Sequence, residues 1–363
     1  MEKKYIGILT SSLLFKRIKR GKKMEILSLY EDAAKKFNLK PCFFRLEDIQ
    51  SGENQLSAFV MGNEGTYDWV KVPKPSIVHN RAYHYTKAAK RKIRKLRSEG
   101  IIFFNEWNRY SKLRIYNILI EDTNCIPYLP KTAMATKQNV MEIMKKHREL
   151  IIKPNSGTLG NSTMKLSLVK ENKWELKYLK NNEWRADIFS VDHWPEKLNK
   201  VVNRSKYIIQ ERIPLATFHG NPFDIRVSVQ RNGQGEWQVT GMVAKMAPKG
   251  SFVTNVAKGG TCYTLQEVLS GNHHLTYEEV YRSISELSLK VASRLGDSLL
   301  NLADIGLDVG IRNDGYPMLI ECNARDLRYS FREAKLFNEW KATYETPIMY
   351  GSFLMNKYKN SHN

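Results

Sequence analysis

The sequence contains few cysteines and no long apolar run. Cys42, Cys125, Cys262 and Cys322 are scattered without Cys-x-x-Cys spacing, which argues against a zinc ribbon and against a disulfide framework. No run of about 18 apolar residues is present to span a bilayer, and the start of the chain holds no apolar block of signal-peptide length. We therefore expect a soluble cytoplasmic protein with reduced thiols and no membrane span.

Acidic residues are scarce relative to basic ones. The chain has 363 residues, of which 37 are Asp or Glu and 58 are Lys or Arg, giving a formal net charge of +21. This excess predicts an anionic partner without identifying it: a nucleotide, an acidic peptide or polymer, a nucleic acid and a membrane surface all stay open. The length predicts a large core and at least two domains.

The first hundred residues show a β-α-β rhythm. Strand patterns over residues 4–10 and 41–45 flank an amphipathic helix pattern over 24–37, and another strand is expected over 76–80. Alternation of this kind predicts a parallel sheet. An apolar strand over 101–107 then follows a strongly basic segment, and this change in composition places a domain boundary near residue 100.

The basic segment, residues 87–97, contains seven basic residues and no acidic one. Ala89, Ile93 and Leu96 form a narrow apolar stripe at helical spacing, which predicts a surface helix with one buried edge. A charged run of this length is most often a solvated face. Nucleic-acid binding is the less favoured alternative, because no aromatic-rich RNA-binding signature accompanies the run.

Two stretches have the composition of phosphate-binding segments. The apolar strand 150–152 leads to Lys153 and into a loop over 155–163 in which glycine and hydroxyl residues dominate. Backbone amides approach phosphate oxygens closely where no Cβ intervenes, and the lysine adds positive charge. Ser111 is expected to cap a helix with one apolar side, made of Leu113, Tyr116, Leu119 and Ile120. The first turn of this helix holds Lys112, a cation that a bound anion would compensate. The loop lacks the closing Gly-Lys-Ser/Thr of a Walker A motif, so a flexible hairpin turn is the alternative.

The segment 222–229 alternates cleanly between polar and apolar residues. Asp224, Arg226 and Ser228 share one face of the predicted strand. A surface salt bridge of little energetic value is the simplest explanation of the charged pair. A hairpin is expected to return the chain to Lys245, after which a second glycine-rich loop follows.

Three oxygen ligands lie on a predicted β-hairpin. The Asn-Asp-Gly turn at 313–315 tolerates positive φ and folds the strand carrying Asp308 back beside the strand carrying Glu321 and Asn323. Glu321 and Asn323 are two positions apart and leave the same face. Two carboxylates and one amide carbonyl suit Mg²⁺, which usually completes its octahedron with waters and phosphates. Exposed residues on a two-stranded edge are the alternative.

Taken in order, these segments resemble the ATP-grasp superfamily and, more closely, its endospore coat-associated YheC/YheD family of Gram-positive spore formers. The matching stretches are residues 75–81, the loop after Lys153, 222–226, 255–260 and 308–323. The resemblance implies the α/β (α+β) class, with an N-terminal α/β domain over 1–100 and the nucleotide-binding and catalytic domains of an ATP-grasp fold over 101–363.

The resemblance also implies an activity. ATP-grasp enzymes are mostly carboxylate-amine ligases, in which ATP phosphorylates a carboxylate and an amine then displaces phosphate from the acyl phosphate, with ATP and Mg²⁺ as cofactors. The residues implied to bind ATP are Lys112, Lys153, Ser156, Gly157, Gly160, Asn161, Ser162, Glu211, Arg212, Ile213 and Asp224. Among them, the segment 211–213 is implied to bind adenine through its backbone. Those implied to act on the transferred phosphate or the substrate are Arg226, Lys245, Asn255, Lys258 and Arg328. Those implied to hold Mg²⁺ are Asp308, Glu321 and Asn323.

One departure from the family pattern concerns the acceptor. Relatives commonly continue after the metal asparagine with a short segment containing Pro and Gly, whereas Ala-Arg-Asp-Leu-Arg follows here at 324–328. Arg325 and Arg328 either bind an acidic acceptor or pair with Asp326. We expect an acidic peptide, protein or polymer as acceptor, and a cytoplasmic protein associated with the spore coat and its proteins. The alternatives are a coat structural protein that binds ATP without turnover and a nucleic-acid-binding protein.

Overall fold

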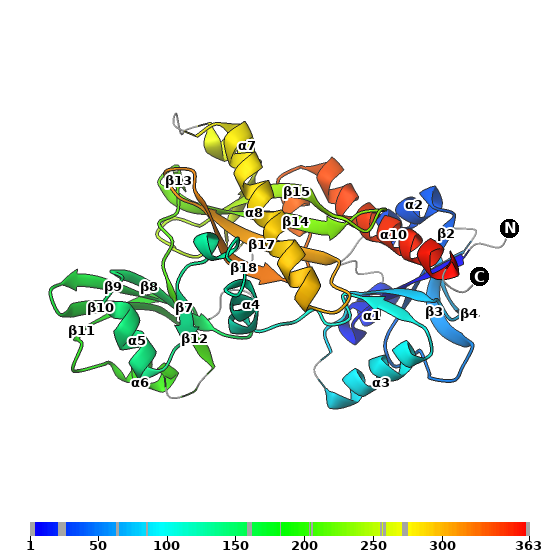
Figure 1. Cartoon of the computed structure of the whole chain (residues 1–363), viewed down its shortest axis with the longest axis horizontal. Coiled ribbons are helices and arrows are strands. Elements are labelled where there is room, and N and C mark those ends of the chain that lie inside the picture. The colour runs from blue at the N-terminus through cyan, green and yellow to red at the C-terminus, as the bar shows by residue number, and fades with distance from the viewer. Residues whose placement is uncertain are drawn as a thin grey trace.

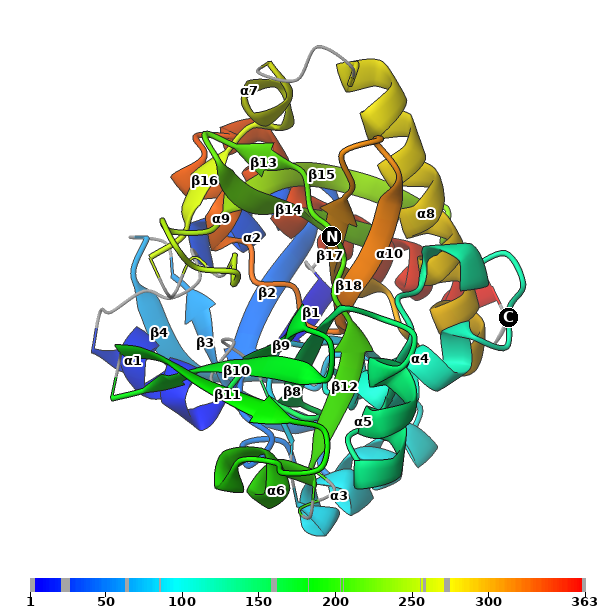
Figure 2. The ribbon, with the colours of Figure 1, turned by 90° about the vertical axis from the view of Figure 1, so that its left-hand side faces the viewer.

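Three sheets of six strands organise the described part of the chain. The computed structural model describes residues 4–20, 27–62, 65–84, 86–157, 162–181, 183–202, 204, 206–254, 256, 259–270 and 275–360. The first and second sheets lie at opposite ends of the molecule, with the third between them (Figure 1). Seen from the end of the second sheet, its strands lie below those of the third (Figure 2). Among the described residues, no helix has both the length and the apolarity that a membrane crossing requires.

The first sheet has the parallel strands expected from the N-terminal rhythm. In the order β4-β3-β2-β1-β5-β6, β1 runs parallel to β2 and β5, and β5 runs parallel to β6. Apolar residues pack on both faces, against α2 on one and α3 on the other. The predicted helix start at residue 24 lies outside the described residues. The elements are β1 (Lys4–Leu9), α1 (Ser12–Lys19), α2 (Leu27–Lys36), β2 (Leu39–Phe44), β3 (Gln55–Met61), β4 (Tyr67–Pro73), β5 (Ile77–Asn80), α3 (Lys87–Ser98) and β6 (Ile102–Phe104).

The second sheet is antiparallel and carries Lys153. Its order is β11-β10-β9-β8-β12-β7. Leu150 and Ile152 lie in a core with residues of α5 and α6, so strand alternation turns Ile151 and Lys153 to the opposite face. The elements are β7 (Thr132–Met134), α5 (Lys137–Met144), β8 (Glu149–Pro154), β9 (Met164–Lys170), β10 (Lys173–Lys180), β11 (Glu183–Ser190), α6 (Glu196–Val202) and β12 (Tyr207–Glu211).

The third sheet is also antiparallel, in the order β16-β15-β14-β17-β18, with β13 paired to β14. The apolar residues of β14 pack against the apolar stripe of α8, which confirms the predicted alternation and leaves Asp224, Arg226 and Ser228 on the opposite face. The elements are α4 (Lys112–Leu119), η1 (Ile126–Tyr128), β13 (Thr217–Phe218), β14 (Asn221–Arg231), β15 (Trp237–Met246), β16 (Thr261–Tyr263), α7 (Leu265–Leu269), α8 (Tyr277–Ser298), β17 (Asp304–Ile311), β18 (Pro317–Asn323) and α9 (Tyr329–Glu333).

The last helix, α10 (Phe337–Asn360), joins the third sheet to the first. Tyr344, Ile348 and Met355 belong to the core beneath α2, and Lys36 Nζ lies 2.6 Å from Glu345 Oε2. The first sheet therefore obtains part of its core from the far end of the sequence. The predicted domain boundary near residue 100 stays a prediction, although β6 lies beyond it and still belongs to the first sheet.

Helix α4 begins as predicted but is rotated relative to expectation. Ser111 Oγ accepts a hydrogen bond from the backbone N–H of Arg114 at 3.3 Å, as an N-cap does. Ile115 and Leu119 are the buried residues of this helix, whereas the sequence pattern favoured a face made of Leu113, Tyr116, Leu119 and Ile120. Packing of this short helix against α8 selects the buried side.

Candidate active site

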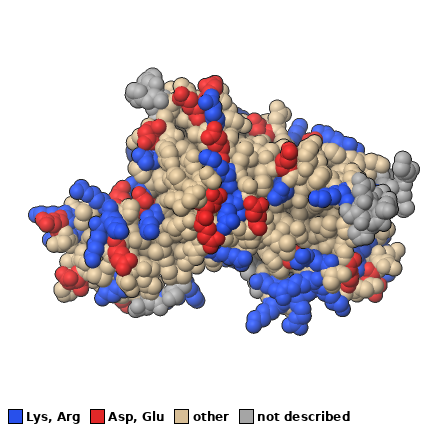
Figure 3. All heavy atoms as spheres, viewed as in Figure 1, with Lys and Arg blue, Asp and Glu red and all other residues tan. Residues whose placement is uncertain are grey.

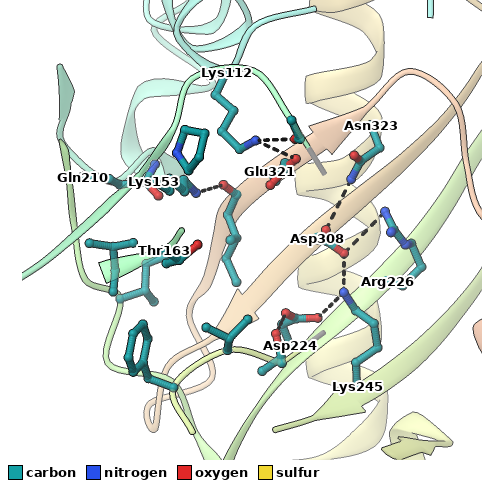
Figure 4. A pocket seen from close by; sticks show the side chains of 18 of the residues that line it. Lys112, Lys153, Thr163, Gln210, Asp224, Arg226, Lys245, Asp308, Glu321 and Asn323 are labelled. Atoms are coloured by element: carbon teal, nitrogen blue, oxygen red, sulfur yellow. Dashed lines mark hydrogen bonds and ion pairs between the residues drawn. The ribbon is translucent and has the colours of Figure 1, made fainter. Parts of the chain in front are cut away.

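A cavity of about 450 Å³ lies between the second and third sheets. Strands β8 and β12 contribute one wall, strands β14, β15, β17 and β18 contribute the other, and Tyr83 joins the lining from the segment after β5. The volume falls in the range of about 300 to 1,000 Å³ that is typical of small-molecule sites. Charged side chains of both walls point into the cavity (Figure 4).

Most of the predicted site residues line this one cavity, although they come from distant stretches of the sequence. Those in the lining are Lys112, Lys153, Ser156, Gly157, Ser162, Glu211, Arg212, Ile213, Asp224, Arg226, Lys245, Asp308, Glu321 and Asn323. Four further predicted residues, Gly160, Asn161, Asn255 and Lys258, lie outside the described residues. The roles of both groups stay predictions.

Lys112 and Lys153 lie together at one end of the cavity (Figure 4). Lys112 Nζ is 3.2 Å from Glu321 Oε1 and donates to the carbonyl of Gly157 at 3.1 Å. Lys153 Nζ donates to the carbonyl of Ile320 at 3.2 Å. Burial lowers the pKa of Lys153 to about 8; nearby Glu321 opposes this shift and Lys112 adds to it. An anion between the two lysines would relieve their repulsion.

Asp308 and Glu321 face each other across the predicted hairpin. Their Cα atoms are register partners between β17 and β18, and Gly315 in the connecting turn has a φ of 81°. Asn323 Nδ2 donates to Asp308 Oδ2 at 3.3 Å. The predicted hairpin and the register that places Asp308 opposite Glu321 are confirmed, whereas metal binding stays a prediction.

A network of alternating charges lies beside Asp308. Lys245 Nζ is 2.6 Å from Asp308 Oδ1 and 2.9 Å from Asp224 Oδ1, and Arg226 Nη1 is 3.4 Å from Asp308 Oδ1. The register explains these contacts, because Asp224 lies opposite Lys245 and Arg226 lies opposite Asp308 on neighbouring strands. All four residues are buried, so the simple surface salt bridge considered from the sequence is excluded.

Burial and pairing act in opposite directions on the pKa values of this network. Burial alone would raise the pKa of Asp308, but Arg226 and Lys245 hold it below its usual range. Burial alone would lower the pKa of Lys245, but Asp224 and Asp308 raise it. The pKa of Asp224 is raised, because burial outweighs the nearby lysine. The two cations and Asp308 therefore stay charged near neutral pH.

The residues predicted to bind Mg²⁺ fit a cation that keeps ligands of its own. Within the described chain, no group of three or more His, Cys, Asp and Glu side chains is arranged as a metal site. Asp308, Glu321 and the amide of Asn323 supply three oxygen donors once that amide turns its oxygen toward the carboxylates. Mg²⁺ commonly binds one or two carboxylates and takes waters and phosphate oxygens for the rest.

The segment expected to meet adenine lies along the wall formed by β12. Glu211 Oε2 accepts the backbone N–H of Lys131 at 3.2 Å, and its Oε1 is 3.4 Å from His147 Nδ1. Arg212 Nη1 pairs with Glu149. Since both charged side chains have protein partners, contacts of this segment with a ligand would come from its backbone and from Ile213, and its role stays a prediction.

Several lining residues were not predicted from the sequence. Tyr83, Gln210, Phe252 and Tyr329 line the cavity, and Tyr83 follows directly after the matched stretch 75–81. Extending the stretch 75–81 by two residues would have identified Tyr83, and Gln210 directly precedes the predicted residue Glu211. Phe252, in the loop between β15 and β16, lies 5.0 Å from Trp184 of β11, measured between ring centroids, a contact between distant segments that no local pattern indicates.

The structure places Arg328 away from the cavity lining and corrects its predicted catalytic role. Its side chain is buried, with Nη2 2.7 Å from Asp304 Oδ2 and Nη1 3.0 Å from Tyr30 Oη. Arg81 Nη1 also lies 3.1 Å from Asp304 Oδ2. Although burial would raise the pKa of Asp304, Arg328 and its other partners hold it well below the usual range. Arg325, three positions earlier, lines the cavity instead.

Comparison with known proteins identifies the family to which this chain belongs. The sequence matches the family described as YheC/D like ATP-grasp over residues 100–354, and the chain therefore belongs to that family. It is similar to the endospore coat-associated protein YheD of Bacillus subtilis (strain 168), with 28% identity over 262 residues that cover 70% of this chain and 55% of YheD. The chain spans about half the length of the curated relatives it matches.

Two solved structures share the fold. The D-cycloserine synthetase DcsG has a TM-score of 0.53 at 9% identity, over 95% of this chain and 99% of DcsG. The ATP-grasp ligase PsnB, complexed with a minimal precursor, has a TM-score of 0.50 at 13% identity, over 94% of this chain and 100% of PsnB. At such low sequence identity, the structural similarity shows the fold alone. It confirms the predicted ATP-grasp fold.

Proposed function

We propose that this chain is an ATP-dependent carboxylate-amine ligase that forms an acyl phosphate and acts on a peptide or protein in a spore-forming cell. One observation carries the proposal: a single cavity holds two lysines at one end and two carboxylates with an amide beside them. A nucleotide with its metal needs both sets, because the phosphates attract cations and Mg²⁺ requires oxygen ligands.

In this proposal Lys112 and Lys153 hold phosphates, and Asp308, Glu321 and Asn323 hold Mg²⁺, which neutralises phosphate charge. At present Lys112 lies 3.2 Å from Glu321, and Lys245 lies 2.6 Å from Asp308. When ATP and Mg²⁺ bind, these ion pairs would exchange partners. Each carboxylate would turn from its lysine to the metal, and each lysine would turn from its carboxylate to an anionic group of the substrates. The exchange keeps every buried charge paired, which avoids the cost of an isolated one.

Arg226 and Lys245 would lie beside the carboxylate that accepts the phosphoryl group. An oxygen of that carboxylate bonds to the terminal phosphorus of ATP, and ADP leaves. The amine nitrogen then bonds to the acyl carbon and loses a proton, while phosphate leaves with the electron pair of the broken C–O bond. Fixed cations favour both steps because they stabilise developing negative charge without reorganising.

An acidic peptide or protein is the proposed acceptor. The net charge of +21 favours an anionic partner, and Arg325 adds a further cation to the cavity lining. PsnB, which shares the fold, was solved in complex with a minimal precursor. The coat association in the description of YheD supports a location in the spore-forming cell and at its coat, and it also favours the second candidate, a coat protein that binds ATP without turnover.

Calorimetry with ATP and Mg²⁺ tests the nucleotide site. Lys153→Ala should weaken ATP binding at least tenfold, because it removes a buried charge from the phosphate end of the cavity. Lys74→Ala is the matched control: this lysine also has a largely buried side chain and is paired, with Glu99 at 3.2 Å, but it directly follows β4 of the first sheet. Equal affinities of Lys153→Ala and the unaltered protein would refute the site.

Turnover distinguishes the proposed ligase from the second candidate, a coat protein that binds ATP without turnover. We expect ADP and phosphate release when ATP, Mg²⁺ and acidic peptides are added together, and a mass increase on the peptide or on its amine partner. Asp308→Asn should abolish this release. ATP binding without release on any acceptor in cell or coat extract would favour the coat protein over the ligase.

A further inference from the structure

Helix α3 has a basic face that the candidate active site does not use. The helix contains seven Lys and Arg residues and no acidic one, and these side chains form a continuous basic area over the lower part of the molecule (Figure 3). Ile93 and Leu96 are its buried residues. The opposite side of the helix therefore faces outward.

Four cations of α3 form a stripe along this outward side. Lys87, Arg91, Arg94 and Lys95 are exposed. Arg91 follows Lys87 by four residues, and Arg94 and Lys95 follow Arg91 by three and four residues, which are helical spacings. Within the described part of the chain, the one ion pair seen for a cation of α3 joins Arg97 to Glu106 at 3.2 Å. Like charges at these spacings destabilise a helix, so the stripe carries an uncompensated attraction for anions.

The stripe begins close to the cavity. Tyr83 lines the cavity and Lys87 opens α3, so the two Cα atoms are at most roughly 15 Å apart along four peptide units. Arg325, which also lines the cavity, has its guanidinium carbon 4.6 Å from the centre of the Tyr83 ring. An anionic chain lying on α3 could therefore continue into the cavity past Tyr83 and Arg325.

We propose that α3 is a docking surface for an acidic polypeptide segment, which holds the acceptor while its reactive end enters the cavity beside Tyr83. The inference rests on the proposed ligase function and extends it, because it gives the acceptor a binding surface outside the cavity. From Lys87 to Lys95 the helix rises roughly 12 Å, which matches about four residues of an extended peptide.

An acidic polypeptide fits this surface better than a nucleic acid does. The helix lies against the first sheet along one side, and no aromatic residue occurs in α3 to stack on a base. Carboxylates of an extended acidic peptide can alternate between cations of the stripe and leave the peptide backbone in solvent. The chain end at the cavity would then be the site of ligation.

The test is a titration of fluorescein-labelled hexaglutamate, followed by fluorescence anisotropy, in the presence of ATP and Mg²⁺. The α3 variant carries Lys87→Gln, Arg91→Gln, Arg94→Gln and Lys95→Gln. Its matched control carries four other exposed lysines changed to glutamine, Lys146, Lys170, Lys173 and Lys180, and has the same net charge. We expect the α3 variant to bind the peptide about tenfold more weakly or worse, since four surface pairs are lost, while the control loses less than threefold.

Calorimetric titration of ATP on the same proteins distinguishes failure of the docking surface from failure of the proposed ligase function. Unchanged ATP affinity shows that the α3 variant is folded and that any effect belongs to docking. Equal peptide affinities of the α3 variant and the control would overturn the docking surface while leaving the ligase proposal intact. Absence of ATP binding by the unaltered protein would overturn the ligase proposal itself. Displacement of hexaglutamate by a single-stranded RNA of equal charge, at lower concentration than unlabelled peptide, would identify α3 as a nucleic-acid surface instead.

Discussion

Replacement of Arg328 by methionine should lower the thermal stability of the protein while leaving its ATP site intact. Methionine retains much of the apolar stem but removes the charge that lies 2.7 Å from Asp304 Oδ2 and the donor to Tyr30 Oη. The guanidinium carbon also lies 4.5 Å from the centre of the Tyr344 ring. Every one of these partners is buried, so water cannot replace the lost contacts.

The size of the effect follows from the environment of Asp304. Removal of one partner from a buried ion pair costs about 3 to 5 kcal/mol. Asp304 keeps Arg81 at 3.1 Å and the side-chain amide of Gln230 at 2.9 Å, which places the loss at about 3 to 4 kcal/mol. The unfolding entropy is about 2.1 cal/mol/K for each of 363 residues. The melting temperature of Arg328→Met should therefore be roughly 4 to 5 °C below that of the unaltered protein.

Differential scanning calorimetry of Arg328→Met and Arg325→Met provides the comparison. Arg325 lines the cavity and lies over Tyr83, so Arg325→Met should change the melting temperature by less than about 1 °C and reduce release of ADP that depends on the acceptor. Arg328→Met should show the reverse, with the melting temperature lowered and ATP affinity at 15 °C unchanged. An unchanged melting temperature combined with lost turnover in Arg328→Met would refute the structural role assigned to this arginine.

Two further outcomes test the charge network. ATP affinity should fall roughly tenfold from pH 7 to pH 9, because the pKa of Lys153 is about 8 and phosphate binds the protonated amine, which is lost as the pH rises. The Lys153→Met variant should bind ATP weakly and without this pH dependence. An identical pH profile in that variant would exclude Lys153 as the titrating group. Gly306→Ala should reduce turnover and stability together, since its Cβ would lie 2.9 Å from Arg226 Nη1 and contact the buried carboxylate of Asp326. A stable and active alanine variant, assayed by melting temperature and ADP release, would contradict the close packing around Arg226.

The parts of the site that were predictable from the sequence are those set by local periodicity. The turn at 313–315 and the apolar residues on either side of it determine the hairpin, and the hairpin determines that Asp308 meets Glu321. Alternation along 222–229 likewise places Asp224 and Arg226 on one face. A period of two residues is sufficient in both cases, because one face of each strand packs on a helix.

The parts that were not predictable depend on contacts between distant segments. Segment 324–328 has no periodicity, so nothing local distinguishes Arg325 from Arg328. Their directions are set by Asp304 on β17 and by Tyr83, which follows β5 of another sheet. The same limit applies to α10, whose place beneath the first sheet depends on packing against α2 rather than on its own sequence pattern.

The position of α10 also has a consequence for synthesis of the chain on the ribosome. Lys36 and Glu345 form an ion pair although 309 residues separate them. At about 5 to 20 residues per second, roughly 15 to 60 s pass between the emergence of α2 and that of its partner helix. During this interval the apolar side of α2 and the sheet beneath it lack their final cover. The first sheet is therefore among the first parts of the chain to be synthesised and among the last parts to complete its packing.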